Sequence, residues 1–229
     1  MPPFNPFGWR RPHVGGPDIP EPFERQRREM VASQLAARGI RDPRVLAAMG
    51  AVPRHEFLPA PMRHAAYHDR ALPIGEGETI SQPYIVALTC EALLLAPGQH
   101  VLDVGSGTGY QTAVLLELGC VVWGIELDPE LAFASRARLE RLGCRGFEIR
   151  AGDGTLGWPE HAPFDAVAVA AAAPEVPPAL LRQLREGGRL VAPVGDDDDQ
   201  VLARFTRHGE EFERQNLGSV RFVPLKFPQ

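Results

Sequence analysis

The chain has 229 residues, of which 44% are hydrophobic and 23% are charged, and these values are ordinary for a soluble globular protein. This length corresponds to roughly one and a half average domains, which favours one large α/β domain with an appendage. The net charge of −5 argues against a protein that binds duplex nucleic acid, because such proteins normally carry a basic surface.

Membrane, secreted and metal-binding classes are also disfavoured. The longest apolar stretches run to about ten residues, which is too short for a transmembrane helix, and the first residues lack the apolar core of a secretory signal. Cys90, Cys120 and Cys144 form no CxxC pair, and His64 and His68 have no third ligand at a fitting spacing. We therefore predict a monomer in the cytoplasm with no metal site, no membrane partner and no nucleic-acid partner.

The predicted elements begin after a proline-rich segment, residues 1–22, which we expect to be a loose tail because proline interrupts both helices and sheet ladders. An arm that wraps the body through its aromatic side chains is the alternative. Residues 23–98 are predicted to form a helical N-terminal subdomain that carries the substrate and active-site segment. Its expected helices start at proline or capping residues and stop at glycine, and they cover 23–39, 43–49 and 83–95.

From residue 99 to 229 the pattern changes to short apolar strands that alternate with helices, which is typical of a parallel sheet covered on both faces. We predict a doubly wound, Rossmann-like α/β core. The expected strands are 101–104, 121–125, 147–150, 166–169 and 190–194, and the expected helices are 108–118, 129–142 and 178–184. Segments 201–206 and 219–223, with a turn near His208-Gly209, are predicted to form an antiparallel pair at the sheet edge.

The strongest single motif is Leu102-Asp103-Val104-Gly105-Ser106-Gly107-Thr108-Gly109-Tyr110, where a strand runs into a glycine turn that opens a helix. Glycines at 105 and 107 allow a ligand to approach the backbone closely, and the helix start offers unpaired N–H groups. The dinucleotide fingerprint would place its third glycine at position 110, where this chain has tyrosine. A P-loop is excluded because no GxxxxGK[ST] occurs.

Acidic residues at the ends of the strands complete the cofactor prediction. Glu126, with Leu127 beside it, ends the second strand, where a carboxylate can accept from both hydroxyls of a ribose. Asp153, followed by Gly154, comes after the third strand, where it can accept from an adenine amine, and Asp103 is placed to meet a ligand ammonium directly or through water. A ligand with an amine, a ribose and an adenine but no pyrophosphate is S-adenosylmethionine. Residues 99–229 are therefore predicted to form the core of a class I methyltransferase.

Further motifs carry a resemblance to a known family. The most specific are Val52-Pro53-Arg54-His55-Glu56-Phe57, Thr79-Ile80-Ser81-Gln82-Pro83-Tyr84 and Val220-Arg221-Phe222-Val223-Pro224-Leu225. Over roughly residues 30–225 the chain resembles the protein-L-isoaspartate (D-aspartate) O-methyltransferases. The resemblance implies methyl esterification of the free carboxylate of L-isoaspartyl residues, and by extension of D-aspartyl residues, in damaged proteins and peptides. The ester then collapses to a succinimide, which hydrolyses partly to aspartate.

The resemblance also implies roles for individual residues. Ser81 is the implied active-site residue, which holds the isoaspartyl carboxylate by a hydrogen bond, although a serine here also suits the cap of the helix that starts at Pro83. The residues implied to lie along the cofactor outside the glycine loop are Thr79, Ile80 and Tyr84, the last with a core-facing aromatic as its alternative. Val223, Pro224 and Leu225 are expected to pair with an extended peptide or, alternatively, to pack as an edge strand. His55 is expected to be structural.

A carboxylate is already ionised at pH 7, so this chemistry needs no general base and depends mostly on positioning. Three alternatives stay open. One is a relative that methylates a dedicated peptide in natural-product maturation, which the proline-rich tail and Ala170, where threonine is expected, leave possible. The others are a methyltransferase for another carboxylate and a cofactor-binding module without catalysis.

Overall fold

The structure is a computed structural model that describes residues 22–75, 77–196 and 199–225. Residues 1–21 of the predicted tail lie outside the described residues, and Pro22 begins the first helix. Of the described helices, none is both long and apolar enough to cross a membrane.

The N-terminal region is helical, as predicted, and α2, Pro43–Ala51, and α3, Pro83–Ala92, start at the expected prolines, although α2 ends two residues later and α3 three residues earlier than predicted. The first helix ends at Gly39, whose φ of 104° is left-handed, and the second is capped by Asp42, whose side chain accepts from the Arg44 N–H. The helices are α1, Pro22–Glu29, which continues as a π-helix, Met30–Leu35, and a 3-10 turn, Ala36–Arg38, followed by α2, Pro43–Ala51, and α3, Pro83–Ala92. Two 3-10 turns, Arg54–Phe57 and Ala60–Ala65, lie between α2 and α3.

A small hairpin before α3 was not predicted. β1, Leu72–Gly75, pairs antiparallel with β2, Glu78–Ile80. Two strands of four and three residues are too short to show the alternation of apolar and polar side chains that signals a strand. The hairpin matters for the site because β2 leads directly into Ser81.

The central sheet confirms the predicted doubly wound core. Within the described residues it has seven strands in the order β5-β4-β3-β6-β7-β8-β9. The five strands β5, β4, β3, β6 and β7 are parallel, and β8 pairs antiparallel with both β7 and β9. The strands are β3, His100–Val104, β4, Val121–Glu126, β5, Phe147–Ala151, β6, Phe164–Val169, β7, Leu184–Asp196, β8, Asp199–His208, and β9, Glu211–Val220. The order reverses between β3 and β6, and ligands of such sheets bind at this point, beyond the carboxyl ends of the strands.

Two predicted boundaries at the C-terminal side are wrong. Leu184, predicted to end a helix, begins β7, and α6 covers only Pro178–Arg182. The predicted strand 219–223 is largely irregular, because β9 ends at Val220. β9 is mostly polar and exposed, so its backbone pairing with β8 stabilises it rather than a pattern of buried side chains that the sequence would display.

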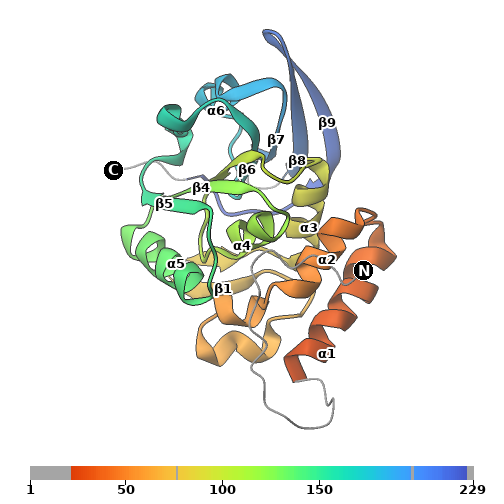
Figure 1. Ribbon diagram of the computed structural model, residues 1–229. Coiled ribbons are helices and arrows are strands. Elements are labelled where there is room, and N and C mark those ends of the chain that lie inside the picture. The colour runs from red at the N-terminus through yellow and green to blue at the C-terminus, as the bar shows by residue number, and fades with distance from the viewer. Residues whose placement is uncertain (1–21, 76, 197–198, 226–229) are drawn as a thin grey trace.

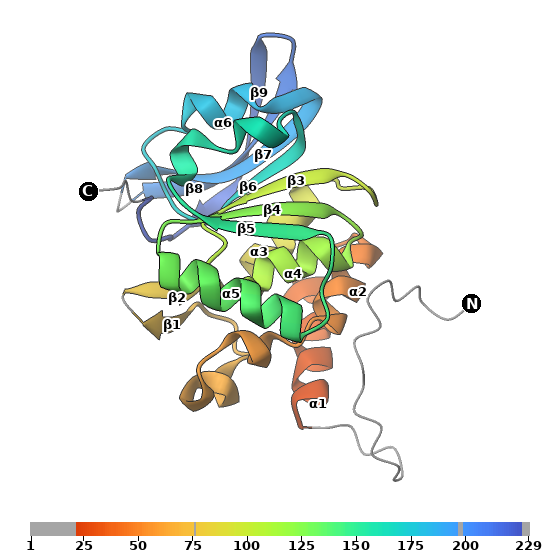
Figure 2. The same cartoon turned by 60° about the vertical axis from the view of Figure 1, so that its left-hand side comes forward.

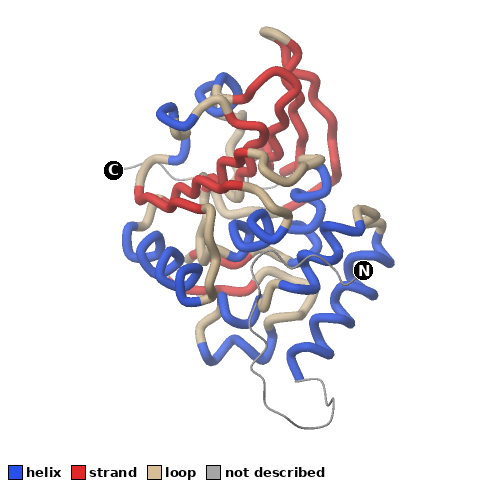
Figure 3. The backbone as a smooth tube through the Cα atoms, viewed as in Figure 1, coloured by secondary structure: helices blue, strands red, loops and turns tan. Residues whose placement is uncertain are grey.

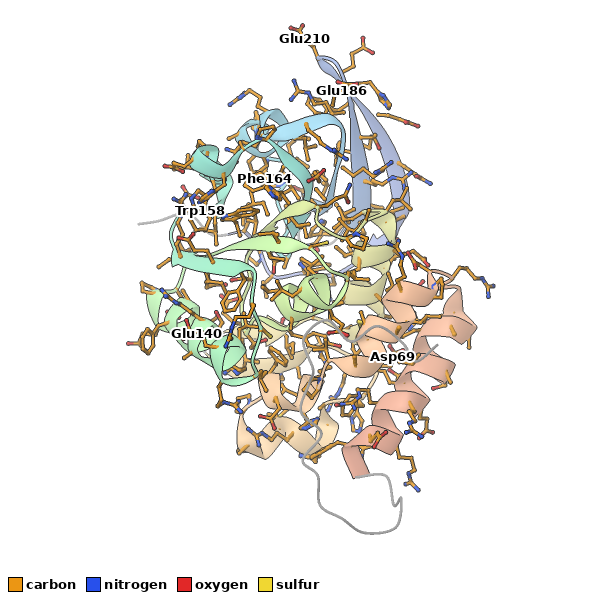
Figure 4. All side chains as sticks on the ribbon, viewed as in Figure 1. Asp69, Glu140, Trp158, Phe164, Glu186 and Glu210 are labelled. Carbon is orange, nitrogen blue, oxygen red and sulfur yellow. The ribbon has the colours of Figure 1, made fainter. Side chains whose placement is uncertain are left out.

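The sheet forms a layer between two groups of helices. α3, α4, Tyr110–Glu117, and α5, Pro129–Arg141, lie on one face and α6 on the other (Figures 1 and 2). In the tube of Figure 3 the strands of the central sheet run together, and the hairpin of β8 and β9 extends beyond the helices; β1 and β2 form a separate sheet. Figure 4 places Trp158 and Phe164 on the α6 side and Glu140 on α5 across the sheet. One apolar core fills each side.

Candidate functional site

A cavity of about 630 Å³ opens beyond the carboxyl ends of β3, β4 and β6, at the point where the strand order reverses. Most of the predicted site residues line it. They are Thr79, Ile80, Ser81, Gly105, Ser106, Gly107, Thr108, Glu126, Leu127, Gly154, Val223, Pro224 and Leu225. The structure thus brings together three segments that are far apart in the sequence, namely β2 with the start of α3, the strand ends, and the C-terminal segment.

The glycine loop has the backbone that the motif predicts. Gly105, Gly107 and Gly109 have φ values of 76°, 54° and 86°, a region that residues with a Cβ rarely adopt. The N–H groups of Gly105 and Ser106 both donate to Ile125 O, at 2.8 and 3.1 Å, which ties the loop to β4. Gly109 is the N-cap residue of α4, which begins at Tyr110. The loop is therefore held in one shape against the neighbouring strand.

Glu126 joins this loop to the cavity. Its Oε2 accepts from the Gly107 N–H at 2.8 Å and its Oε1 accepts from the Asp128 N–H at 3.2 Å. Burial raises the pKa of this carboxyl, and the backbone donors of Asp128 and Gly107 oppose the rise. A carboxylate offers about four acceptor positions, so Glu126 retains capacity for hydroxyl donors from a ligand. A ribose has two hydroxyls that can donate to this carboxylate, and the glycines of the loop leave room for a ligand beside it. The site therefore fits the ribose of S-adenosylmethionine.

Four predicted cofactor residues do not line the cavity: Tyr84, Asp103, Gly109 and Asp153. Tyr84 stacks instead under the Arg38 guanidinium, 3.9 Å from the ring centroid. The Asp153 carboxylate accepts from the N–H and hydroxyl of Thr155, at 2.9 and 2.7 Å, and so caps the 3-10 turn Gly154–Leu156.

Asp103 is fully buried on the α4 side of β3. Its Oδ1 accepts from Gln111 Nε2 at 2.8 Å and its Oδ2 from Thr112 Oγ1 at 2.6 Å. Burial raises the pKa of Asp103 to about 6, while the bonds from Thr112 and Gln111 oppose the rise. The structure therefore shows no direct exposure of this carboxylate to the cavity. Strand alternation explains this, because Leu102 and Val104 face the opposite core.

Ser81 lies between β2 and α3 and lines the cavity with its neighbours Thr79 and Ile80. The alternative role as a helix cap is not seen, since α3 starts at Pro83 with Gln82 as its cap residue and without a side-chain capping bond. Gln82 Nε2 donates to Asp69 Oδ1 at 2.7 Å and thereby anchors the segment. The Ser81 hydroxyl is thus not engaged in capping α3.

The C-terminal segment forms another part of the cavity wall. The Ala172 N–H donates to Val223 O at 2.9 Å and the Leu225 N–H donates to Ala172 O at 2.6 Å, so the segment runs alongside the chain that leaves β6. Val223, Pro224 and Leu225 line the cavity that Ser81 also lines. A ligand in this cavity would meet both segments at once.

Sequence reasoning missed several lining residues, of which Tyr110 and Gln111 are the most informative. In the sequence, Tyr110 stands out only as the residue that replaces the third glycine of the dinucleotide fingerprint. Its ring packs against the buried Arg54 guanidinium, 4.9 Å from the centroid, and edge-on to Phe57 at 5.5 Å. The segment of Arg54 and Phe57 therefore supports the first residue of α4. A polar residue directly after Tyr110 at the helix start was the available signal for Gln111.

His55 lies away from the cavity lining. Its Nδ1 is 2.8 Å from Tyr67 Oη, and its ring stacks on Phe23 with centroids 4.2 Å apart. Burial lowers the pKa of His55. These contacts join α1 to the turns that follow α2, which is a structural role.

Comparison with known proteins gives a consistent assignment. A family model described as protein-L-isoaspartate(D-aspartate) O-methyltransferase matches residues 25–227. The chain is 56% identical to a protein-L-isoaspartate O-methyltransferase from Methylorubrum populi over 200 residues, which cover 87% of this chain and 94% of the relative. It is 50% identical to the protein of the same name from Methanoculleus marisnigri over 205 residues, which cover 90% of this chain and 93% of that relative.

Solved structures agree with these relatives. A structure named protein-L-isoaspartate O-methyltransferase superposes with a TM-score of 0.79 at 30% identity, covering 87% of this chain and 66% of that chain. A structure from Plasmodium falciparum, described as a protein-L-isoaspartate O-methyltransferase in complex with S-adenosyl-L-homocysteine, superposes with a TM-score of 0.76 at 30% identity, covering 87% of this chain and 98% of that one.

Proposed function

Because this chain belongs to the protein-L-isoaspartate (D-aspartate) O-methyltransferase family, we propose that it methylates the free carboxylate of L-isoaspartyl residues in damaged proteins, with S-adenosylmethionine as methyl donor. The methyl ester would open the route through a succinimide back to aspartate, which is protein repair. The lining of the cavity supports this proposal independently of the family. A single cavity is lined both by the glycine loop with Glu126 and by Ser81 with the C-terminal segment.

The glycine-loop end of the cavity suits the cofactor. When bound, S-adenosylmethionine supplies a methyl group carried on a positively charged sulfur. Glu126 would accept hydrogen bonds from the ribose hydroxyls, and its bond from the Gly107 N–H holds the carboxylate in place. Leu127 and Gly154 also line the cavity and are proposed to border the adenine. Thr79 and Ile80 would lie along the cofactor from the opposite side.

The other end of the cavity suits a peptide carboxylate. The carboxylate arrives ionised at pH 7, so the protein does not have to remove a proton from it. We assign to Ser81 the role of donating a hydrogen bond to this carboxylate and holding it toward the cofactor. The segment Val223–Leu225 would bind the peptide backbone by strand pairing, which allows recognition of many different sequences.

We further propose that the chain works as a monomer in the cytoplasm. Cys90, Cys120 and Cys144 are buried and unpaired, which suits a reducing compartment. The large exposed apolar side chains of the described residues, Leu94, Phe133 and Leu156, come from three separate segments rather than one. These features support a protein that has no permanent partner.

The test is methyl transfer from labelled S-adenosylmethionine to a pair of peptides that differ only in isoaspartate against aspartate at one position. We expect transfer to the isoaspartyl peptide alone. Transfer to neither peptide, while cofactor binding is intact, would contradict the proposal and favour a dedicated peptide or another carboxylate. Transfer to both peptides would contradict the selectivity for isoaspartate.

A further inference from the structure

A buried hydrogen bond decides how one cavity residue presents its side chain. Gln111, in the first turn of α4, lines the cavity and donates from Nε2 to Oδ1 of Asp103 at 2.8 Å. Asp103 itself is fully buried and does not line the cavity. Asp103 can therefore affect the cavity through Gln111, the lining residue to which it is hydrogen-bonded.

The chemistry of the two groups leaves one arrangement of the Gln111 amide. An ionised carboxylate only accepts hydrogen bonds, and a side-chain amide has a donating NH₂ at one end and an accepting oxygen at the other. Thr112 Oγ1 occupies the other Asp103 oxygen at 2.6 Å, so Asp103 is held from both sides. With its NH₂ directed to Asp103, Gln111 must present its carbonyl oxygen elsewhere. Among the described residues no donor to Gln111 Oε1 is found.

We infer that the carbonyl oxygen of Gln111 accepts a hydrogen bond from the ammonium group of the amino-acid part of the cofactor, and that Asp103 is a positioning residue that keeps this oxygen turned toward it. The inference rests on the proposed function, since it names the contact of one part of S-adenosylmethionine. Two other carboxylates of the cavity wall already accept hydrogen bonds from the protein. Glu126 accepts from Gly107 and Asp128, and Asp128 caps α5 through the N–H groups of Glu130 and Leu131.

The test compares two ligands by titration calorimetry. S-adenosylhomocysteine carries the amino-acid part with its ammonium, whereas 5′-methylthioadenosine has the same adenine and ribose without it. In Gln111→Met the affinity for S-adenosylhomocysteine should fall about tenfold or more, the size expected for a hydrogen bond to a charged group. The affinity for 5′-methylthioadenosine should stay within about twofold. Gln34→Met is the matched control, because Gln34 is also half-buried and donates one bond, to Tyr67 O, away from the cavity.

The positioning role of Asp103 is tested by a double-mutant cycle. Asp103→Leu removes the acceptor and should reduce the affinity for S-adenosylhomocysteine but not that for 5′-methylthioadenosine. If Asp103 acts through Gln111, adding Asp103→Leu to Gln111→Met causes little further loss. Losses that add in the double variant would overturn the positioning role, because Asp103 would then act independently of Gln111.

The remaining outcomes separate this inference from the proposed function. Unchanged binding of S-adenosylhomocysteine to Gln111→Met overturns the inference and leaves the proposed function intact. Equal losses for both ligands also overturn it, since they indicate a general effect on the cavity. A wild-type protein that binds neither ligand contradicts the proposed function itself. If Asp103→Leu does not fold, the comparison of the two ligands on Gln111→Met still decides the contact.

Discussion

The backbone N–H of Gly107 donates a hydrogen bond to Oε2 of Glu126 at 2.8 Å, and this bond joins the loop after β3 to the end of β4. The two residues are 19 positions apart, and the strands that precede Gly107 and end at Glu126 are parallel neighbours in the sheet. One carboxylate therefore shapes the glycine loop and faces the cavity at the same time. Substitutions at Glu126 should act on cofactor binding through both effects.

Glu126→Ala is expected to weaken binding of S-adenosylhomocysteine by about 1–3 kcal/mol, or roughly 5- to 150-fold, because ribose hydroxyls would lose their acceptor. Titration calorimetry measures the change. Glu140→Ala is the control, since Glu140 lies on α5 and its exposed carboxylate forms an ion pair with Arg136. Equal affinity in Glu126→Ala and the wild type would show that the ribose assignment is wrong.

Ser81→Ala is expected to lower the rate of methyl transfer to an isoaspartyl peptide by roughly 10- to 150-fold, the range for a lost hydrogen bond to a charged group. Affinity for S-adenosylhomocysteine should change little. The measurement is initial rate at saturating cofactor, with calorimetry on the same preparation. Ser33→Ala, which removes a hydroxyl that donates to Glu29 O, serves as control. Normal turnover in Ser81→Ala would remove Ser81 from the catalytic role.

The two glycines that flank Asp153 should respond differently to substitution. A Cβ on Gly154 would lie 2.6 Å from Val104 Cγ1, which is buried in the core, so Gly154→Ala is expected to lower the free energy of unfolding by about 1–3 kcal/mol. A Cβ on Gly152 would meet only Ile125 Cγ2, at 4.0 Å, so Gly152→Ala should change it by less than about 0.5 kcal/mol. Urea denaturation tests both, and equal losses would refute the packing argument.

Asp103 should make stability depend on pH in the acid range. Its pKa is raised from an ordinary 3.8 to about 6, so between these pH values the folded protein binds a proton at Asp103 that the unfolded chain has released. The contribution of Asp103 to the free energy of unfolding is therefore greatest below pH 3.8. It declines as the pH rises to about 6 and is constant at higher pH. The free energy of unfolding falls by at most about 3 kcal/mol across this pH interval because of Asp103.

Asp103→Asn removes this titration and is the corresponding variant. The difference in free energy of unfolding, variant minus wild type, should increase from pH 4 to pH 7. Urea denaturation of both proteins across this range measures it, and effects of other carboxyl groups cancel in the difference. A difference that is independent of pH would mean that Asp103 has an ordinary pKa in the folded protein.

Local patterns in the sequence were sufficient for much of the fold and part of the site. Prolines at the starts of α2, α3 and α5 and glycine after the first helical segment set their limits within the chain itself. The glycine spacing after β3 predicted the turn that opens α4, and the structure shows that its glycines have positive φ. These features depend on φ, ψ and capping of neighbouring residues, and so they are visible without knowledge of the rest of the molecule.

Other features depend on partners that are distant along the chain. β9 is held by its pairing with β8, and β1 and β2 are too short to show a period. The role of the Gln111 side chain depends on its bond to Asp103 and on its place in the cavity wall. Each of these depends on a partner elsewhere in the fold.

The sequence by itself determined the order of elements, the glycine turn and the acidic residues at the strand ends, because short-range geometry and side-chain chemistry decide them. Only the tertiary structure decided which of these acids reach the cavity. Glu126 is the last residue of β4 and lines the cavity, whereas the Asp103 side chain is directed to α4, where it accepts a hydrogen bond from Thr112. Successive strand residues face opposite sides, so one position along the chain separates a side chain at the cavity from one in the core.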